Sequence, residues 1–173
     1  MKQSMILVVF FAVFTPGPAW GDGAVYGMTN AIGDNEVVLW ERASTGQLTF
    51  KNAYHTGGGG SGIQLDPTDS LGSQGSIKLT ANRKTLFAVN TETGASNTQD
   101  CNTGSISSFA VDRDGFLTLM GKALSGGLFP SSLTVRGDVL YVLNSGGPGT
   151  CGTMPNITGF RITPNGQLSP IAG

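Results

Sequence analysis

Charged side chains are scarce in this sequence, at 12% of 173 residues, and the formal net charge is only −1. The chain therefore lacks the basic excess of a nucleic-acid-binding surface, and we expect no nucleic-acid partner. It has a single histidine, His55, and only two cysteines, Cys101 and Cys151. Two cysteines and one distant histidine make a poor set of zinc ligands, so we expect no metal site and no cofactor.

Long apolar runs are also missing, apart from one near the N-terminus. The run MILVVFFAVF (5–14) follows Lys2 and precedes the small residues Gly17 and Ala19. A membrane-spanning helix needs roughly 20 apolar residues, whereas a shorter run with these flanks is typical of a secretory signal peptide. We therefore predict a signal peptide at 1–21, and a secreted, extracellular protein with no membrane association after cleavage; the alternative for this run is a buried strand.

Glycine is abundant, with 27 residues, and 8 prolines accompany it. Both residues weaken helices and punctuate short strands, and long stretches with helical spacing are missing. The composition therefore favours an all-β fold with many turns.

The most informative feature is an internal repeat. Three ten-residue segments align without gaps, each with an aromatic residue six positions before a glycine and a leucine two positions after it. They are WERASTGQLT (40–49), FAVDRDGFLT (109–118) and FRITPNGQLS (160–169). Turns such as Asp114-Gly115 and Asn165-Gly166 suit the positive φ angles of tight β-hairpins. Each segment therefore predicts a hairpin.

Further short strands precede the hairpins and complete units of four strands. Buried strands are expected at 24–29, 85–90 and 139–144, and inner strands at 76–80 and 131–135. Such units predict a β-propeller of four-stranded antiparallel blades in one domain at 22–173. Blade 1 covers about 24–55 and lacks its inner strand, blade 2 about 76–124, and blade 3 about 131–172.

About three blades form an incomplete propeller, because propellers typically have about 4–8. Three interpretations are open: a truncated product, an assembly of several copies, or an open stack of sheets. Open blade edges also favour self-association.

Three phrases of the sequence carry a family resemblance. They are GAVYGMTN (23–30), GSQGSIKLTANRKTLFAVN (72–90) and NITGFRITPNGQLSPI (156–171). They resemble the lactonase-type seven-bladed β-propellers, which include 6-phosphogluconolactonase and the fungal carboxymuconate-lactonising enzymes. The resemblance covers residues 23–173 and matches the first three blades of that family.

The resemblance implies a pocket at one end of the propeller axis, where histidine, arginine and glutamate open or close a sugar-acid or muconate lactone. The inner strands of this chain begin instead with Gln74-Gly75-Ser76 and Pro130-Ser131-Ser132. No catalytic residue can therefore be assigned. We expect a secreted lactonase-like protein with little or no lactone hydrolase or cyclase activity on its own; the alternative is a non-enzymatic interaction or antigen-type module.

Three polar residues, Gln74, Asn90 and Asn144, are candidates for the family's pocket, and His55 is a separate case. Gln74 precedes an inner strand, and Asn90 and Asn144 end buried strands, where their amides could instead bond the adjacent loops. His55 ends the outermost strand of blade 1, where we favour an exposed strand-end residue over a general base.

Three loops complete the predictions. Cys101 and Cys151 lie in equivalent loops of neighbouring blades, and a secreted protein favours a disulfide between them, worth about 4 kcal/mol through loop entropy. Asn156 begins the glycosylation acceptor Asn156-Ile157-Thr158.

The stretch HTGGGGSG (55–62) resembles an engineered linker, but Gly126-Gly127 recur 69 residues after Gly57-Gly58. We therefore interpret it as a native, flexible loop between blades 1 and 2.

Overall fold

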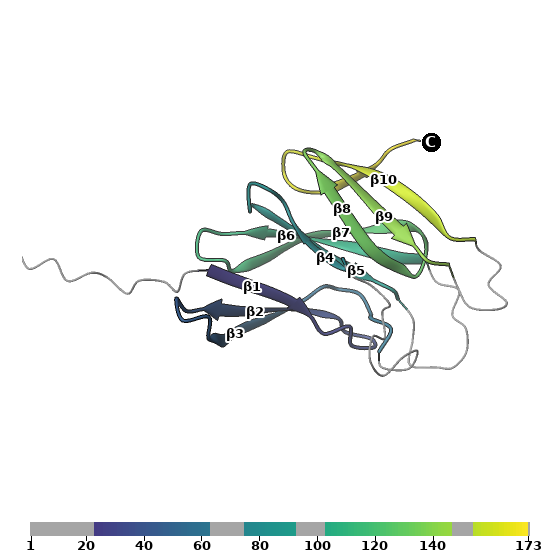
Figure 1. Cartoon of the computed structure of the whole chain (residues 1–173). Helices are drawn as coiled ribbons and strands as arrows, with labels where there is room; N and C mark the ends of the chain where they lie inside the picture. Colours follow the sequence, from purple (N-terminus) through teal and green to yellow (C-terminus); the bar gives the residue numbers. More distant parts are fainter. Residues whose placement is uncertain (1–22, 63–74, 93–102, 147–153, 173) are drawn as a thin grey trace, which may run out of the picture.

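The fold is a stack of three antiparallel β-sheets, seen in a computed structural model that describes residues 23–62, 75–92, 103–146 and 154–172 (Figure 1). These ranges contain strands, turns and loops but no helix. Accordingly, no helix of the described ranges is long and apolar enough to cross a membrane. The predicted all-β class and the incomplete propeller-like architecture are confirmed.

Each sheet is formed by strands that follow one another in the chain. The first sheet has the order β1-β2-β3, the second β4-β5-β6-β7, and the third β11-β10-β9-β8. The bounds are β1 Gly23–Met28, β2 Glu36–Arg42, β3 Leu48–His55, β4 Ile77–Leu79, β5 Thr85–Asn90, β6 Thr103–Val111, β7 Leu117–Leu128, β8 Pro130–Arg136, β9 Val139–Asn144, β10 Asn156–Ile162 and β11 Leu168–Pro170. Within the described ranges the first sheet has three strands and no inner strand, as the sequence predicts.

The observed strands lie close to the predicted ranges, with one clear difference. The predicted outer strand of the second sheet ends at residue 124, but β7 continues to Leu128. Its last part pairs with the start of β6, since Leu128 lies opposite Thr103. Gly126 and Gly127 therefore belong to a strand, and only residue 129 connects β7 to β8.

The repeated hairpin turns are built as the sequence predicts. Gly46, Gly115 and Gly166 have φ angles of 86°, 86° and 80°. Each glycine amide donates to the carbonyl oxygen three residues earlier, on Ala43, Asp112 and Thr163. This repeated geometry explains why a glycine occurs at the same place in all three segments.

A bulge recurs in the first two sheets just after these turns. The register between β2 and β3 shifts at Leu39/Trp40, and that between β6 and β7 shifts at Ser108/Phe109. Lys51 and Met120 are the residues skipped in the two registers. They are 69 residues apart and so occupy equivalent positions.

Two hydrophobic clusters hold the three sheets together. Val37, Leu86, Ala88, Phe109 and Leu117 form the cluster shared by the first and second sheets. The cluster shared by the second and third sheets contains Phe87, Val89, Ile106, Leu133, Leu140, Val142 and Phe160. Since β5 contributes alternate residues to both clusters, it is buried on both faces.

The end of each outer strand packs closely against the next sheet. A Cβ atom on Gly58 would lie 2.7 Å from Cγ of Asn90, and one on Gly127 would lie 2.7 Å from Cγ of Asn144. No side chain fits at either glycine, because real Cβ atoms do not approach other atoms so closely. We call these two contacts the first and second joints.

The glycine-rich stretch that begins at His55 is part of the first joint. Thr56 and residues 58–62 are buried, and the amide of Gly60 donates to the carbonyl oxygen of Ala31 at 2.7 Å. Residues 56–62 therefore form a packed connection in which Gly57 is exposed, and the predicted flexibility stays a prediction. The predicted signal peptide at 1–21 and both cysteines, Cys101 and Cys151, lie outside the described residues.

We expect Gly58→Ala to destabilise the protein by about 1–3 kcal/mol, the usual cost of overpacking a filled core. Gly121→Ala is the matched control, because a Cβ there would meet only Nε2 of Gln167 at 3.6 Å. Urea unfolding of both variants measures the difference. Equal free energies of unfolding for the two variants would contradict the close packing at the first joint.

Candidate functional site

The candidate pocket residues lie at the end of the stack that carries the loops after β1, β5 and β9. Gln74 lies outside the described residues. Asn90 ends β5 and Asn144 ends β9, and their exposed fractions are 0% and 1%. Both side chains therefore lie inside the stack, and their role as pocket residues stays a prediction.

Asn90 connects two sheets through its amide group. Its Nδ2 donates to the hydroxyl groups of Ser107 at 2.8 Å and Ser105 at 3.1 Å. Its Oδ1 accepts from Nδ2 of Asn35, which also donates to the carbonyl oxygen of Val89. The hydroxyl of Ser107 in turn donates to the carbonyl oxygen of Thr56, so the joint is polar as well as tight.

Asn144 is the counterpart of Asn90 at the second joint, but its amide is only partly satisfied. Its Nδ2 donates to Oδ1 of Asn156 at 2.7 Å and to the carbonyl oxygen of Ser125 at 3.2 Å. Its Oδ1 is buried and has no hydrogen-bond partner among the residues that the structure describes. At the first joint the side-chain amide of Asn35 bonds the oxygen of Asn90. The equivalent residue at the second joint, 69 positions later, is Gly104, which has no side-chain amide, and Pro130 fills the space beside it.

Glu92 adds a charged group to the first joint. Its carboxylate accepts hydrogen bonds from the hydroxyl of Ser105 at 2.6 Å, the amide of Gly59 at 3.0 Å and Nζ of Lys122 at 3.1 Å. Burial alone would raise the pKa of Glu92, but these hydrogen bonds outweigh it and hold the pKa below its usual value. The carboxylate therefore stays ionised and fastens the glycine-rich stretch to the second sheet.

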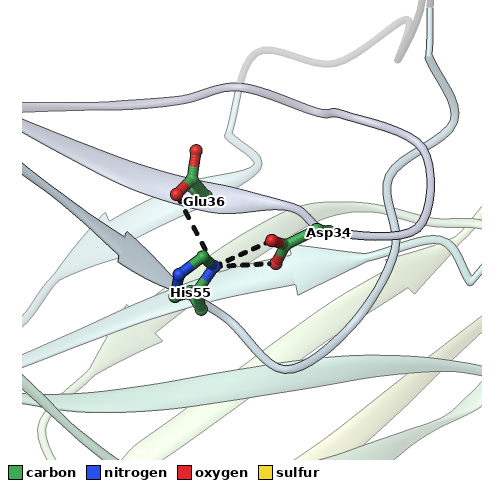
Figure 2. Close-up of side chains that lie close together, drawn as sticks. All are labelled: Asp34, Glu36 and His55. Carbon is green, nitrogen blue, oxygen red and sulfur yellow. Dashed lines mark hydrogen bonds and ion pairs between the residues drawn. The ribbon is translucent and has the colours of Figure 1, made fainter.

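His55 lies beside two carboxylates on the surface of the first sheet (Figure 2). Its Nδ1 is 2.8 Å from Oδ2 of Asp34 and 3.6 Å from Oε1 of Glu36. Strand pairing explains one contact, because Glu36 lies opposite His55, and Asp34 comes from the loop before β2. The exposed fractions of the His55 and Asp34 side chains are 70% and 58%.

The two carboxylates raise the proton affinity of the imidazole. The hydrogen bond to Asp34 is the main reason why the pKa of His55 lies above its ordinary 6.5, and the charges of Asp34 and Glu36 add to it. The three ligand atoms lie within 4.8 Å of one another, so one nitrogen and two carboxylate oxygens could also bind a divalent ion together with water. The expected absence of a metal site stays a prediction.

Sequence reasoning missed the carboxylates of this cluster. Asp34 lies 21 residues before His55 in the chain and forms a hydrogen bond with it. Continuing the register from the turn, where Arg42 pairs with Leu48, would place Glu36 opposite Tyr54; the bulge at Lys51 shifts the pairing by one residue and brings Glu36 opposite His55. The position of Asp34 depends on the loop and could not be predicted in this way.

Asn156, the predicted glycosylation residue, begins β10 and has an exposed side chain. Its Nδ2, the atom that would carry a glycan, donates to the carbonyl oxygen of Gly126 at 3.2 Å. Glycosylation of this residue stays a prediction.

Comparison with solved structures supports a lactonase-like fold. Two matching crystal structures are of proteins described as putative 6-phosphogluconolactonases. The first is from Bacteroides fragilis NCTC 9343, with a TM-score of 0.53 and 18% sequence identity. The match covers 84% of this chain and 33% of the Bacteroides fragilis chain. The second is from Bacteroides uniformis ATCC 8492, with a TM-score of 0.50 and 17% sequence identity. The match covers 78% of this chain and 31% of the Bacteroides uniformis chain.

This chain thus spans about a third of the length of those two proteins. At such identities the likeness shows the fold alone. No protein-family model and no curated protein matched the sequence.

We expect Asn90→Ala to destabilise the protein by about 2–3 kcal/mol, since it removes the three buried hydrogen bonds that the Asn90 side chain makes to Ser105, Ser107 and Asn35. Asn144→Ala should cost at least about 1 kcal/mol less, because it also removes an unpaired buried oxygen. Thermal and urea unfolding of both variants provide the test. An equal or larger loss for Asn144→Ala would mean that its amide oxygen has a partner.

We expect the pKa of His55 to lie above 6.5 and to fall in Asp34→Asn, while Asp138→Asn leaves it unchanged. Because the folded pKa is raised, the stabilising pair is fully present below the unfolded pKa and is lost as the pH rises through the folded pKa. Proton NMR measures this directly, since His55 is the only histidine. Identical titration curves for the native protein and Asp34→Asn would disprove the pairing.

Proposed function

We propose that this chain supplies consecutive sheets of a lactonase-like β-propeller and has little or no lactone hydrolase or cyclase activity on its own. The observation that carries the proposal is the match of its three-sheet stack to about a third of two putative 6-phosphogluconolactonases. A pocket on a propeller axis is surrounded by all the blades, and three sheets contribute only part of such a wall.

The arrangement of polar groups supports the lack of activity. At the loop end of the described sheets, Asn90 and Asn144 are buried in the joints. His55 lies on β3, an outer strand of the stack, where its partners are Asp34 and Glu36. A general base needs to be within hydrogen-bond reach of a bound substrate, and an imidazole on an outer strand is remote from an axial pocket.

We also propose the cellular setting that the sequence predicts. Residues 1–21 direct secretion, and the oxidising exterior favours a Cys101–Cys151 disulfide and a glycan on Asn156. A small lactone or sugar acid is the ligand class that the resemblance implies for a complete pocket.

A non-enzymatic interaction module is the second candidate, and one surface favours it. Tyr141, Leu143 and Ile157 lie on the exposed face of the third sheet, with exposed fractions of 51%, 40% and 70%. A contiguous apolar face of this kind marks a contact surface, which in the proposed propeller would be covered by another sheet. In the module interpretation the same face would mediate self-association.

Assays of the purified chain with a sugar-acid lactone and a muconate lactone test the proposal. We expect hydrolysis at the uncatalysed rate, and no difference between the native chain and His55→Ala. Light scattering on the same preparation reports the oligomeric state, because an assembled ring would contain several copies. Saturable turnover that is lost in His55→Ala would overturn the proposal and make this histidine catalytic.

A further inference from the structure

A cleft opens between the first and second sheets, at the end opposite the loops that hold Asn90 and Asn144. Its volume is about 660 Å³, and it lies among β1, β2, β3 and the turns that follow β4 and β6. Pockets that bind small molecules usually have about 300–1,000 Å³. The cleft is therefore large enough for a ligand of sugar-acid size.

The cleft is rich in basic side chains. Five of the ten lysine and arginine residues of the chain line it, whereas only three of its eleven acidic residues do. The basic ones are Arg42, Lys51, Arg83, Lys84 and Arg113. In a chain with a net charge of −1, this is a local concentration of positive charge.

Two of the three acidic side chains of the cleft already have partners, one of them a cation of the cleft itself. Glu41 forms an ion pair with Lys51 at 2.5 Å. Oδ1 of Asp112 accepts from the amides of Asp114 and Phe116, which holds it in its own turn. Arg83, Lys84 and Arg113 have no ion-pair partner among the described side chains, so they are available to an anion.

The backbone of Arg83 provides an independent observation. Arg83 has a φ angle of 59°, a left-handed conformation that costs a non-glycine residue about 1–2 kcal/mol. In the corresponding turn of the third sheet, a glycine, Gly137, takes the left-handed place with a φ angle of 61°. An arginine at such a position points to a use for its side chain that outweighs the strain.

The interface between the second and third sheets differs from this cleft at the corresponding end. Met120 is the counterpart of Lys51, and there the main-chain oxygen of Met120 accepts a hydrogen bond from Nε2 of Gln167 at 3.3 Å. Gly166 packs so closely that a Cβ on it would lie 2.5 Å from Cε of Met120. The space between the second and third sheets is thus narrower at this end, with a cleft of about 180 Å³ beside Gln167, whereas the space between the first and second sheets is wider and lined by cations.

Tyr26 fixes the width of the cleft at its base. Its hydroxyl donates to the carbonyl oxygen of Gly115 at 2.7 Å and so connects β1 to the turn that carries Arg113. Burial, and next the nearby Tyr54 and Asp112, raise its pKa to about 12. The hydroxyl therefore stays protonated and remains a donor at physiological pH.

We infer that this cleft binds a small organic anion whose carboxylate or phosphate group is held by Arg83 and Arg113. Guanidinium groups hold such groups through paired, charge-assisted hydrogen bonds. The body of the ligand rests on the apolar wall formed by Leu39, Val111 and Phe116. This inference is independent of the proposed function, because the cleft lies at the opposite end of the stack from the implied lactonase pocket.

Calorimetric titration of the full chain with inorganic phosphate and with gluconate tests the inference. We expect saturable binding of at least one probe at 150 mM salt. Binding of phosphate alone assigns a phosphate-bearing ligand, and binding of gluconate alone assigns a carboxylate. Arg113→Gln should weaken binding about tenfold or more, as expected for the loss of one charge-assisted hydrogen bond.

Two further variants make the test specific. Arg83→Gly should weaken binding similarly while keeping the fold, because glycine suits the left-handed backbone. Arg161→Gln removes an exposed arginine of β10 that pairs with Asp138, and should leave binding unchanged. Binding of neither probe, or an equal effect of all three substitutions, would overturn the inference.

Discussion

The close approach of each outer strand to the next sheet is the constraint on which the rest of this structure depends. Gly58 and Gly127 let the backbone of one sheet contact the buried amide of Asn90 or Asn144 in the next. A side chain at either glycine would force the sheets apart, and the two hydrophobic clusters between them would lose contact. The glycine content of the chain is therefore concentrated where a sheet stack needs it, as well as in its turns.

Much of this architecture could be predicted from the sequence, because it depends on local patterns. The hairpin turns carry a glycine at a fixed offset, and their positive φ angles follow from that residue. The burial of HTGGGGSG could not be predicted in this way. Glycine offers no side chain to reveal its surroundings, and the partners of the stretch, Asn30 and Glu92, come from other parts of the chain.

The candidate sites show the same division. The hairpin that joins β2 and β3 could be predicted, whereas the bulge at Lys51 that brings Glu36 opposite His55 and the path of the loop that carries Asp34 could not. The cleft depends on still longer-range geometry, since its basic side chains come from both the first and second sheets. No spacing in the sequence groups these residues, and only the packing of one sheet on the next brings them together.

The two joints differ in how they are held, although they repeat the same backbone contact. The first also has the side-chain amide of Asn35 and the ionised Glu92. The hydrophobic cluster between its two sheets contains five buried apolar residues. At the second, Oδ1 of Asn144 has no partner within the described ranges, and the cluster between the two sheets is larger, with seven residues. Apolar contacts weaken on cooling. The third sheet should therefore be the part of the stack that is most sensitive to low temperature, and the first joint the part that stays intact in the cold.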